Sequence, residues 1–395
     1  MVNKGLNELA SESLFHTVSF TNTENSPVKF AKTVSSSSRK HIRHVVINTS
    51  DDPDREITQQ DASEAEILGV FRDAIALFPQ LERLERAELK FSSSCIANYD
   101  NDDEVPESED FRAEIQDLCF QALVKCEKIK SLTIKNLQDA MSEEVLESES
   151  FLIVRGRLTE MHLRIVSQTT ECAPDRDIDE EALHQGFTCG LPRYWLKPAT
   201  NQLIRLTLDC DVYWGLWPLT DFREIPPFPH LKSMCFGNWT IAHDWQVDWI
   251  VAHEITLEVL LLYDCTVVRD LRMDREQAEA NFPQMVQPEP TVDYGSQGTA
   301  TYPEYSVEVD LRWHQIFERF RVGLERLRHY DLKRDFSVAA YYSFDYGISS
   351  PWDPYIPEVG EDGRNMQDPD CDEKNERAFV ALAETVQQRA STKTE

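Results

Sequence analysis

A short apolar pattern repeats along the chain and limits the folds that the chain can adopt. Each copy has an apolar residue, two others, an apolar residue, one other and a third apolar residue, as in "LEVLLL" at residues 257–262. The last two apolar positions alternate as in a strand with one buried face, while the first lies where the chain enters the strand. We therefore expect one short strand in each copy. The copies begin at Ile42, Leu84, Ile129, Leu158, Leu203, Leu231, Leu257 and Leu327.

This pattern is the layout of a leucine-rich repeat. Three copies, beginning at Leu203, Leu231 and Leu257, follow one another at intervals of about 26 to 28 residues, within the range for such repeats. Cys265 then occupies the turn position whose side chain faces inward. The predicted fold class is α/β, an irregular leucine-rich-repeat-like solenoid with parallel strands on one face, helices on the other and long acidic loop insertions. A generic α/β domain with parallel strands fits the same alternation and is the alternative.

Helical spacing of apolar residues between the copies agrees with a strand–helix repeat. Residues 115–123 and 313–324 both show it. A third helix is expected from Ser63, which with Glu66 has the spacing of a capping box, and it should end before Pro79.

The expected domain organisation follows from these elements. Residues 40–395 should form a single leucine-rich-repeat-like domain, preceded by a segment at 1–39. A helix at 374–390 places Phe379, Leu382, Ala383 and Val386 on one face and is expected to close the end of the solenoid. Acidic or Gly-, Pro- and Ser-rich stretches predict mobile insertions near 98–110, 168–181, 284–306 and 347–373.

The stretch "FGNWTIAHDWQVDWIVAHE" at residues 236–254 gathers polar and aromatic side chains, as a metal site does. His243 and His253 are ten residues apart, about 280° around a helix, so they do not share a face. Trp245 and Trp249 do share one, and Asp244 has the chemistry of an N-cap residue. We therefore expect a helix held to the sheet by its tryptophans. No metal site is predicted.

Charge and cysteine usage limit the environment and the partners of the chain. It has 70 Asp and Glu residues against 40 Lys and Arg residues, a formal net charge of −30, which repels nucleic acid and anionic membrane surfaces. The nine cysteines include no C-x-x-C pair and predict reduced thiols. Without a signal-like apolar segment, the expected localisation is intracellular, cytoplasmic or nuclear.

Motifs of catalysis are absent from the sequence, so the chain is expected not to be an enzyme. There is no G-x-S-x-G elbow, glycine-rich phosphate loop or H-E-x-x-H, and no catalytic residue or cofactor is predicted. The Trp-rich insertion at 211–229 offers Tyr213, Trp214 and Trp217 as candidate partner-binding aromatics. The alternatives are an insertion that folds these rings back onto the repeats, and a small-ligand binder or enzyme that uses them.

Two adjoining segments carry a family resemblance. "GLPRYWLKPATNQLIRLTLDCDVYWGLWP" and "FPHLKSMCFGNWTIAHDWQVDWIVAHEITLEVLLLYDC" resemble the leucine-rich-repeat region of filamentous-fungal F-box proteins. Such proteins show W-L-x-P-A-x-x-L-x-x-L-x-L, then F-P-x-L-x-x-L-x-L-G and H-D-x-Q-x-D-W-I, and then L-E-x-L-x-L-x-x-C. The match is close over residues 191–265 and looser elsewhere.

The resemblance implies a substrate receptor of an SCF-type ubiquitin ligase, in which an F-box binds the adaptor and the repeats bind a target protein. The segment at 1–39 resembles the region that follows an F-box, and it begins almost at Met1. Adaptor binding is therefore expected only if an F-box is encoded upstream. The resemblance leads us to expect a protein-recognition scaffold with an unidentified target, or a truncated relative without a ligase role.

Overall fold

The structure of the chain is a computed structural model, whose described residues form two compact units. The first comprises Met1–Thr169, Ala182–Asp211 and Phe228–Leu231, and the second Thr170–Glu181, Val212–Pro227 and Lys232–Glu395. The four predicted insertions lie wholly or mostly outside the described residues, and the single domain over 40–395 stays a prediction. The structure describes residues 4–51, 65–93, 107–167, 185–211, 213–216, 219–268, 270–273, 305–333, 338–339, 342–343 and 371–392.

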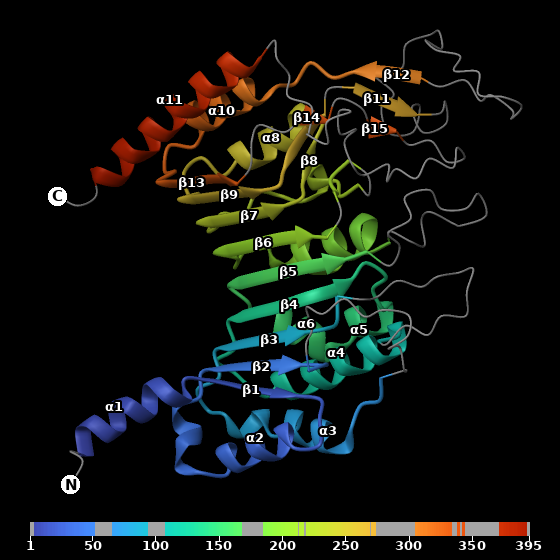
Figure 1. Cartoon of the computed structure of the whole chain (residues 1–395), viewed down its shortest axis with the longest axis vertical. Helices are drawn as coiled ribbons and strands as arrows, with labels where there is room; N and C mark the ends of the chain where they lie inside the picture. Colours follow the sequence, from blue (N-terminus) through green and yellow to red (C-terminus); the bar gives the residue numbers. More distant parts are fainter. Residues whose placement is uncertain are drawn as a thin grey trace, which may run out of the picture. The chain divides into compact units, whose positions relative to one another are not determined.

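Parallel strands build the sheet of the first unit, and each strand pairs with the strand next to it in the sequence (Figure 1). The order therefore runs from β1 to β6 without reversal. The prediction of an α/β protein with parallel strands is confirmed. The strands are β1 (Thr17–Thr21), β2 (His44–Asn48), β3 (Arg86–Lys90), β4 (Ser131–Gln138), β5 (Glu160–Val166) and β6 (Arg205–Cys210).

The repeated pattern marks these strands because its three apolar positions are the buried ones. In the copy that contains β6, for example, Leu203, Leu206 and Leu208 are 0 to 1% exposed. Burying a side chain of this size contributes about 1.5 to 3 kcal/mol. One strand, β1, was not predicted from the sequence. β1 carries a copy without leucine, in which Val18 and Phe20 pair with Val45 and Ile47 of β2.

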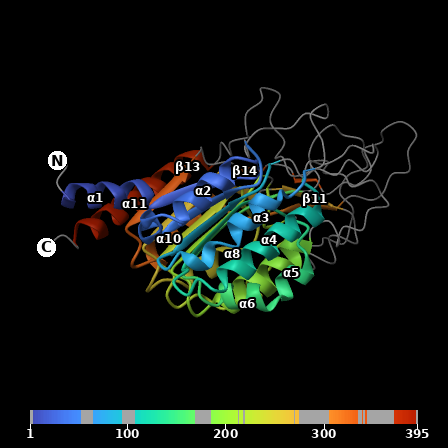
Figure 2. The same cartoon turned by 90° about the horizontal axis from the view of Figure 1, so that it is seen from below.

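Helices α4, α5 and α6 cover one face of this sheet (Figure 2). Each begins after a serine whose hydroxyl accepts a hydrogen bond from an early helical N–H group: Ser108, Ser142 and Ser148. The helix expected from Ser63 begins at Gly69 instead, because the backbone of Leu68 is extended, and Ser63 itself is outside the described residues. The α-helices described in this unit are α1 (Lys4–Phe15), α2 (Ser26–Val34), α3 (Gly69–Ile75), α4 (Glu109–Leu123), α5 (Glu143–Glu147) and α6 (Glu149–Arg155), and a π-helix at Gly186–Leu196 carries Trp195.

Aromatic rings fill the space between the helices and the sheet of the first unit. Phe20 of β1 stacks on Phe30 of α2 with ring centroids 4.6 Å apart, and Phe71 of α3 lies 5.3 Å from Phe20. Further along the sheet, Phe151 lies 4.8 Å from Trp195 in an edge-on contact. These contacts hold the helices against one face, so that the opposite face is left to form a surface.

The second unit repeats the strand pattern on a smaller scale. Its parallel strands β7, β9 and β13 pair in that order, and Met234 and Phe236 lie beside Leu260 and Leu262. Cys265 is buried at the turn after β9, as predicted, and its thiol contacts the carbonyl of Phe236. The elements include β7 (Ser233–Gly237), β8 (Thr240–Ile241), α8 (Asp244–Val251), β9 (Val259–Tyr263), β10 (Thr266–Val268), β11 (Asp270–Met273), β12 (Tyr305–Glu308), α10 (Trp313–Gly323), β13 (His329–Lys333), β14 (Val338–Ala339), β15 (Tyr342–Ser343) and α11 (Asp372–Ser391).

Helix α11 corresponds to the helix expected at 374–390. Its side chains form hydrogen bonds with backbone groups at both ends of α10. The Asn375 side chain accepts a hydrogen bond from the N–H of His314 at 2.9 Å, in the first turn of α10. Arg389 donates to the carbonyl of Leu324 at 2.7 Å, just beyond the last turn. Of the four residues predicted to share the packed face, Leu382 and Val386 are buried, whereas Ala383 is exposed.

Candidate functional site

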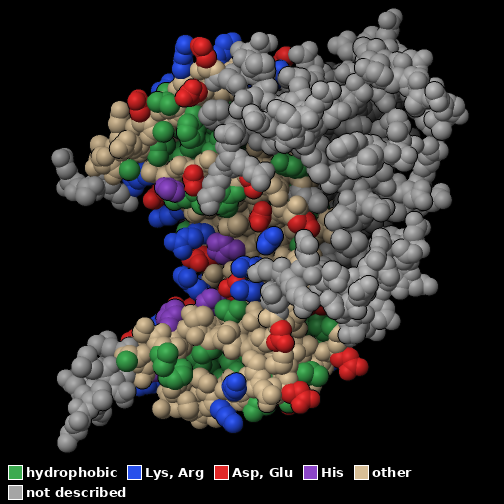
Figure 3. All heavy atoms as spheres, in the orientation of Figure 1, with side chains coloured by type: hydrophobic (Ala, Val, Ile, Leu, Met, Phe, Trp, Pro, Cys, Tyr) green, Lys and Arg blue, Asp and Glu red, His purple; other side chains and the backbone are tan. Residues whose placement is uncertain are grey.

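The open face of the first unit is the side of the sheet opposite α4–α6. Because side chains alternate along a strand, the residues between the buried ones point to this side. Almost all of them are half-buried or exposed, and most are polar. In Figure 3, Lys, Arg and His side chains gather over β4–β6 on this face, with a few acidic side chains among them. The outward-facing residues of β2–β6 are His44, Val46, Asn48, Arg86, Glu88, Lys90, Ser131, Thr133, Lys135, Glu160, His162, Arg164, Arg205, Thr207 and Asp209.

Two lysines surround one carboxylate in what we call the Lys cluster. Glu88 of β3 lies 3.3 Å from Lys90 Nζ, 3.6 Å from Lys135 Nζ and 3.6 Å from His44 Nε2. The neighbouring His44 side chain is the largest cause, ahead of the two lysines, that holds the pKa of Glu88 at about 2, against the opposing effect of burial. Glu88 is therefore fully ionised near neutral pH.

Two arginines surround a second carboxylate in what we call the Arg cluster. Arg205 Nη1 donates to Glu160 Oε1 at 2.7 Å, and Arg86 Nη2 lies 4.0 Å from Glu160 Oε2. In the strand register, Ser131 lies between Arg86 and Glu160 and is only 6% exposed. A small residue at that position leaves room for the two long side chains to meet above it.

His162 lies in the middle of the open face. Its Nδ1 is 2.8 Å from the Thr207 hydroxyl on the adjacent strand. Burial lowers the pKa of His162, an effect that the nearby Glu160 partly opposes. The imidazole is therefore neutral near pH 7 and adds hydrogen-bonding capacity to the surface rather than charge.

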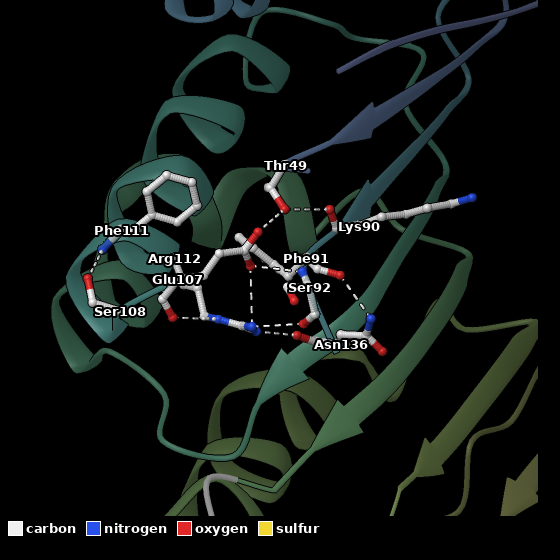
Figure 4. Close-up of polar contacts among 9 residues, drawn as sticks. All are labelled: Thr49, Lys90, Phe91, Ser92, Glu107, Ser108, Phe111, Arg112 and Asn136. Atoms are coloured by element: carbon white, nitrogen blue, oxygen red, sulfur yellow. Dashed lines mark hydrogen bonds and ion pairs between the residues drawn. The ribbon is translucent and has the colours of Figure 1, made fainter. Parts of the chain in front are cut away.

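A second set of polar residues, which we call the buried cluster, lies inside the protein at the carboxyl ends of β2, β3 and β4 (Figure 4). Glu107 and Arg112 are each 2% exposed and form an ion pair of 3.3 Å. The Glu107 carboxylate also accepts hydrogen bonds from the Thr49 hydroxyl and from the N–H of Ser92, the latter at 2.8 Å. Burial raises the pKa of Glu107, and Arg112 is the main opposing influence.

Arg112 connects the strand ends to one another. It donates to the carbonyls of Ser92 at 2.8 Å and Asn136 at 2.6 Å, beyond β3 and within β4. Asn136 has a positive φ of 60°, and its amide donates to the carbonyl of Phe91 at 2.8 Å. This buried cluster satisfies backbone groups that would otherwise be costly to bury, so its role is structural.

The stretch at 236–254 forms a core element of the second unit. His243, not Asp244, is the N-cap residue of α8, and Gln246 accepts from its N–H at 2.9 Å. Trp249 is buried and donates to the carbonyl of Ile225 at 2.9 Å, but Trp245 is only half-buried, with Arg223 over its ring. The prediction that both tryptophans hold the helix to the sheet is therefore wrong for Trp245, because its ring points toward the surface loop that carries Arg223.

The histidines and aspartates of that stretch also serve structural contacts. His253 is 1% exposed, and its Nδ1 lies 3.0 Å from the carbonyl of Trp249. Asp244 and Asp248 are exposed and pair with Arg319 of α10. Throughout the described part of the chain, no group of three or more His, Cys, Asp or Glu side chains has the arrangement to hold a metal ion.

The three candidate aromatics of the Trp-rich insertion differ in position. Trp214 is 1% exposed, and its Nε1 donates to the carbonyl of Gly237 at 2.8 Å. Its ring packs against Phe236, with centroids 5.9 Å apart, so Trp214 belongs to the core of the second unit. Tyr213 is half-buried, and Trp217 lies outside the described residues. A partner-binding role for Tyr213 and Trp217 stays a prediction.

Comparison with known proteins adds no family assignment. No model of a protein family matches the chain, and no curated protein matches it.

None of the helices described is long and apolar enough to cross a membrane.

Sequence reasoning located the strands of the open face but missed both of its charged clusters. The signal was present: in β3, Arg86, Glu88 and Lys90 alternate with the buried residues. Their partners come from strands that are distant in the sequence, so only the register of the sheet brings them together. The buried Glu107–Arg112 pair was also missed, because Glu107 lies within a stretch that reads as an acidic loop.

Proposed function

We propose that the chain is a non-enzymatic protein-recognition scaffold that binds a target protein through the open face of the first unit. The observation that carries this proposal is the ordered array of half-exposed polar side chains on β2–β6, mounted on strands whose other face is packed. Such side chains are held in fixed register, so a partner meets a preorganised surface and less conformational entropy is lost on binding.

The topology of the first unit supports a leucine-rich-repeat-like solenoid over a generic α/β domain. A solenoid places each strand beside the preceding one, as in β1–β6, and packs its helices on one face. Doubly wound α/β sheets reverse their strand order and carry helices on both faces. The entry positions of the repeats that form β2–β6 are also completely buried: Ile42, Leu84, Ile129, Leu158 and Leu203 are all 0% exposed.

Site-specific photo-crosslinking tests the scaffold proposal. The photoreactive residue p-benzoylphenylalanine replaces Thr133 on the open face, or, as a control, the exposed Gln121 on the outer side of α4. In extracts of the source cells, the Thr133 variant should crosslink to a discrete protein and the Gln121 variant should not. Equal labelling at both positions, or none at Thr133, would contradict the proposal.

We further propose, from the family resemblance alone, that the bound target is delivered to an SCF-type ubiquitin ligase. Co-purification with the ligase adaptor tests this step separately, with this chain and with one extended upstream. Adaptor binding by either chain supports delivery to a ligase. Binding by neither would end the ligase proposal and leave the scaffold proposal intact.

A further inference from the structure

We propose that the open face of the first unit binds an acidic segment of its partner protein, through the Lys cluster and the Arg cluster. This inference rests on the proposed function and names the chemistry of the target. Three observations carry it: the exposure of the charged groups, their excess over the opposite charge, and their spacing.

The cations on this face are more exposed than the carboxylates they surround. In the Arg cluster, the side chains of Arg86 and Arg205 are 56% and 52% exposed, against 20% for Glu160. In the Lys cluster, Lys135 is 40% exposed against 17% for Glu88. The carboxylates therefore lie beneath the cations, and an approaching partner meets positive charge first.

The same face is positively charged in a chain that is strongly negative. The outward-facing residues of β2–β6 include five Lys or Arg side chains and three Asp or Glu side chains, an excess of two positive charges. The whole chain has an excess of 30 negative charges. A local reversal of charge favours one kind of partner and, by repulsion elsewhere on the surface, fixes where that partner can dock.

Each embedded carboxylate also prepares its cations for binding. An arginine has several N–H donors in a fixed fork, so Arg205 can pair with Glu160 and still offer donors to a second carboxylate. The existing ion pair restrains the long side chain, and a partner then loses less rotamer entropy when it binds.

The spacing of the two clusters suits an extended acidic segment. Arg86 and Lys90 are both on β3, four residues apart, which corresponds to about 13 Å along a strand. Carboxylates of one extended segment span this distance when they are about four residues apart. One segment can therefore engage both clusters at once.

A protein segment fits this face better than a nucleic acid does. Single-stranded nucleic acids need aromatic side chains for stacking, and none of the outward-facing residues of β2–β6 is Phe, Tyr or Trp. The large negative charge of the chain also repels a continuous phosphate backbone more strongly than a short acidic peptide.

Fluorescence anisotropy on the full chain tests the inference, with a short labelled peptide of alternating Asp and Gly as the probe. A peptide of the same length with Asn in place of Asp, and an oligouridylate, are the comparison probes. The Asp peptide should bind, and binding should weaken as salt is raised. Absence of binding, or tighter binding of the oligouridylate, would overturn the inference.

Charge-reversal variants locate the site. Arg205→Glu and Lys135→Glu should each weaken binding of the Asp peptide by at least about fivefold, because they replace attraction with repulsion. Lys32→Glu on α2 and Lys125→Glu after α4 make the same change in net charge at exposed positions away from this face. If these controls weaken binding equally, the effect comes from the net charge of the chain and the inference is wrong.

A variant that is expected to tighten binding controls for misfolding, because a misfolded chain would bind more weakly. Glu160→Gln keeps an oxygen acceptor for Arg86 and Arg205 but removes the negative charge, so it should tighten binding of the Asp peptide by about two- to fivefold. Weaker or unchanged binding would contradict the inference. If the partner crosslinked at Thr133 is captured equally well by Arg205→Glu and Lys135→Glu, the acidic-target inference fails while the scaffold proposal stands.

Discussion

The first unit contains two carboxylate–guanidinium groups, one buried and one exposed. In the buried cluster, Glu107 and Arg112 are 2% exposed, and they are enclosed by the Thr49 hydroxyl and by backbone groups of Ser92 and Asn136. In the Arg cluster, Glu160 is 20% exposed and its arginine partners are more than half exposed. Both are carboxylate–guanidinium pairs, and only their access to water differs.

This difference decides what each pair can do. A buried charge without its partner is costly, so the Glu107–Arg112 pair fixes the strand ends and has no freedom to engage a ligand. A surface pair contributes little to stability because water competes with it, so its donors are available to a partner protein. The buried pair at the strand ends therefore contributes to stability, and the exposed pairs lie on the open face that we propose as the binding surface.

The largest effect is expected from removing the buried cation. Arg112→Met should lower the free energy of unfolding by about 3 to 5 kcal/mol, since it leaves the Glu107 carboxylate buried without a counter-charge. Urea denaturation followed by circular dichroism measures the loss. The double variant Glu107→Gln with Arg112→Met should recover part of it, and a cost below about 1 kcal/mol for Arg112→Met would remove the contrast between the two groups.

The next largest effect is expected on the free energy of unfolding at acid pH, through Glu88 of the Lys cluster. Because the pKa of Glu88 is lowered from 4.5 to about 2 in the folded chain, its stabilisation is present above about pH 4.5 and is lost as the pH falls toward about 2. The shift corresponds to about 3 kcal/mol. Glu88→Gln should flatten the dependence of the unfolding free energy on pH over this range. A wild-type slope that persists in Glu88→Gln would assign the acid sensitivity to other carboxylates.

A smaller effect is expected at Asn136, whose positive φ is part of the buried cluster. Both Asn136→Gly and Asn136→Ala lose the hydrogen bond to the Phe91 carbonyl, at a net cost of about 1 kcal/mol. Alanine should cost about a further 1 kcal/mol, because its Cβ opposes a left-handed backbone. Thermal unfolding of the two variants isolates this difference, and equal stabilities would show that the backbone relaxes.

The smallest effect on stability is expected in the Arg cluster. Arg205→Gln should change the free energy of unfolding by less than about 1 kcal/mol, because its ion pair with Glu160 is largely exposed. The same urea denaturation measures it beside Arg112→Met. A loss comparable to that of Arg112→Met would show that the open face is held together by its charges rather than prepared for binding.

The strands and their buried faces were predictable from the sequence, and the reason is local. In each copy the apolar spacing alone decides which side of the strand is buried, so strands such as β5 and β6 were found where they were expected. β1 was missed because its alternation is weak: two of its five residues are threonine, and only Phe20 is fully buried. The start of α3 was placed too early because a Ser–Glu spacing indicates a cap but does not require one.

The candidate binding surface was predictable only in part. Alternation identifies Arg86, Glu88 and Lys90 as outward-facing, but their charges say nothing by themselves about which neighbours they meet. Glu88 meets Lys135, and Glu160 meets Arg205, across gaps of about 45 residues that no short-range pattern covers. For Trp214 the sequence left two alternatives open, a partner-binding aromatic or a ring folded back onto the repeats, and its burial agrees with the second.

The sequence by itself determined the α/β fold class, because the alternation of apolar residues sets one buried and one open face on the strands of the repeated pattern, such as β2, β3 and β6. The tertiary structure decided which charges on the open face become neighbours, and that Glu107 and Arg112 of α4 form a buried pair. The physical reason is that burial and pairing depend on the register between strands and on the path of the loops. Glu107 therefore belongs to a buried structural cluster, whereas Glu160 belongs to the exposed surface that we propose for partner binding.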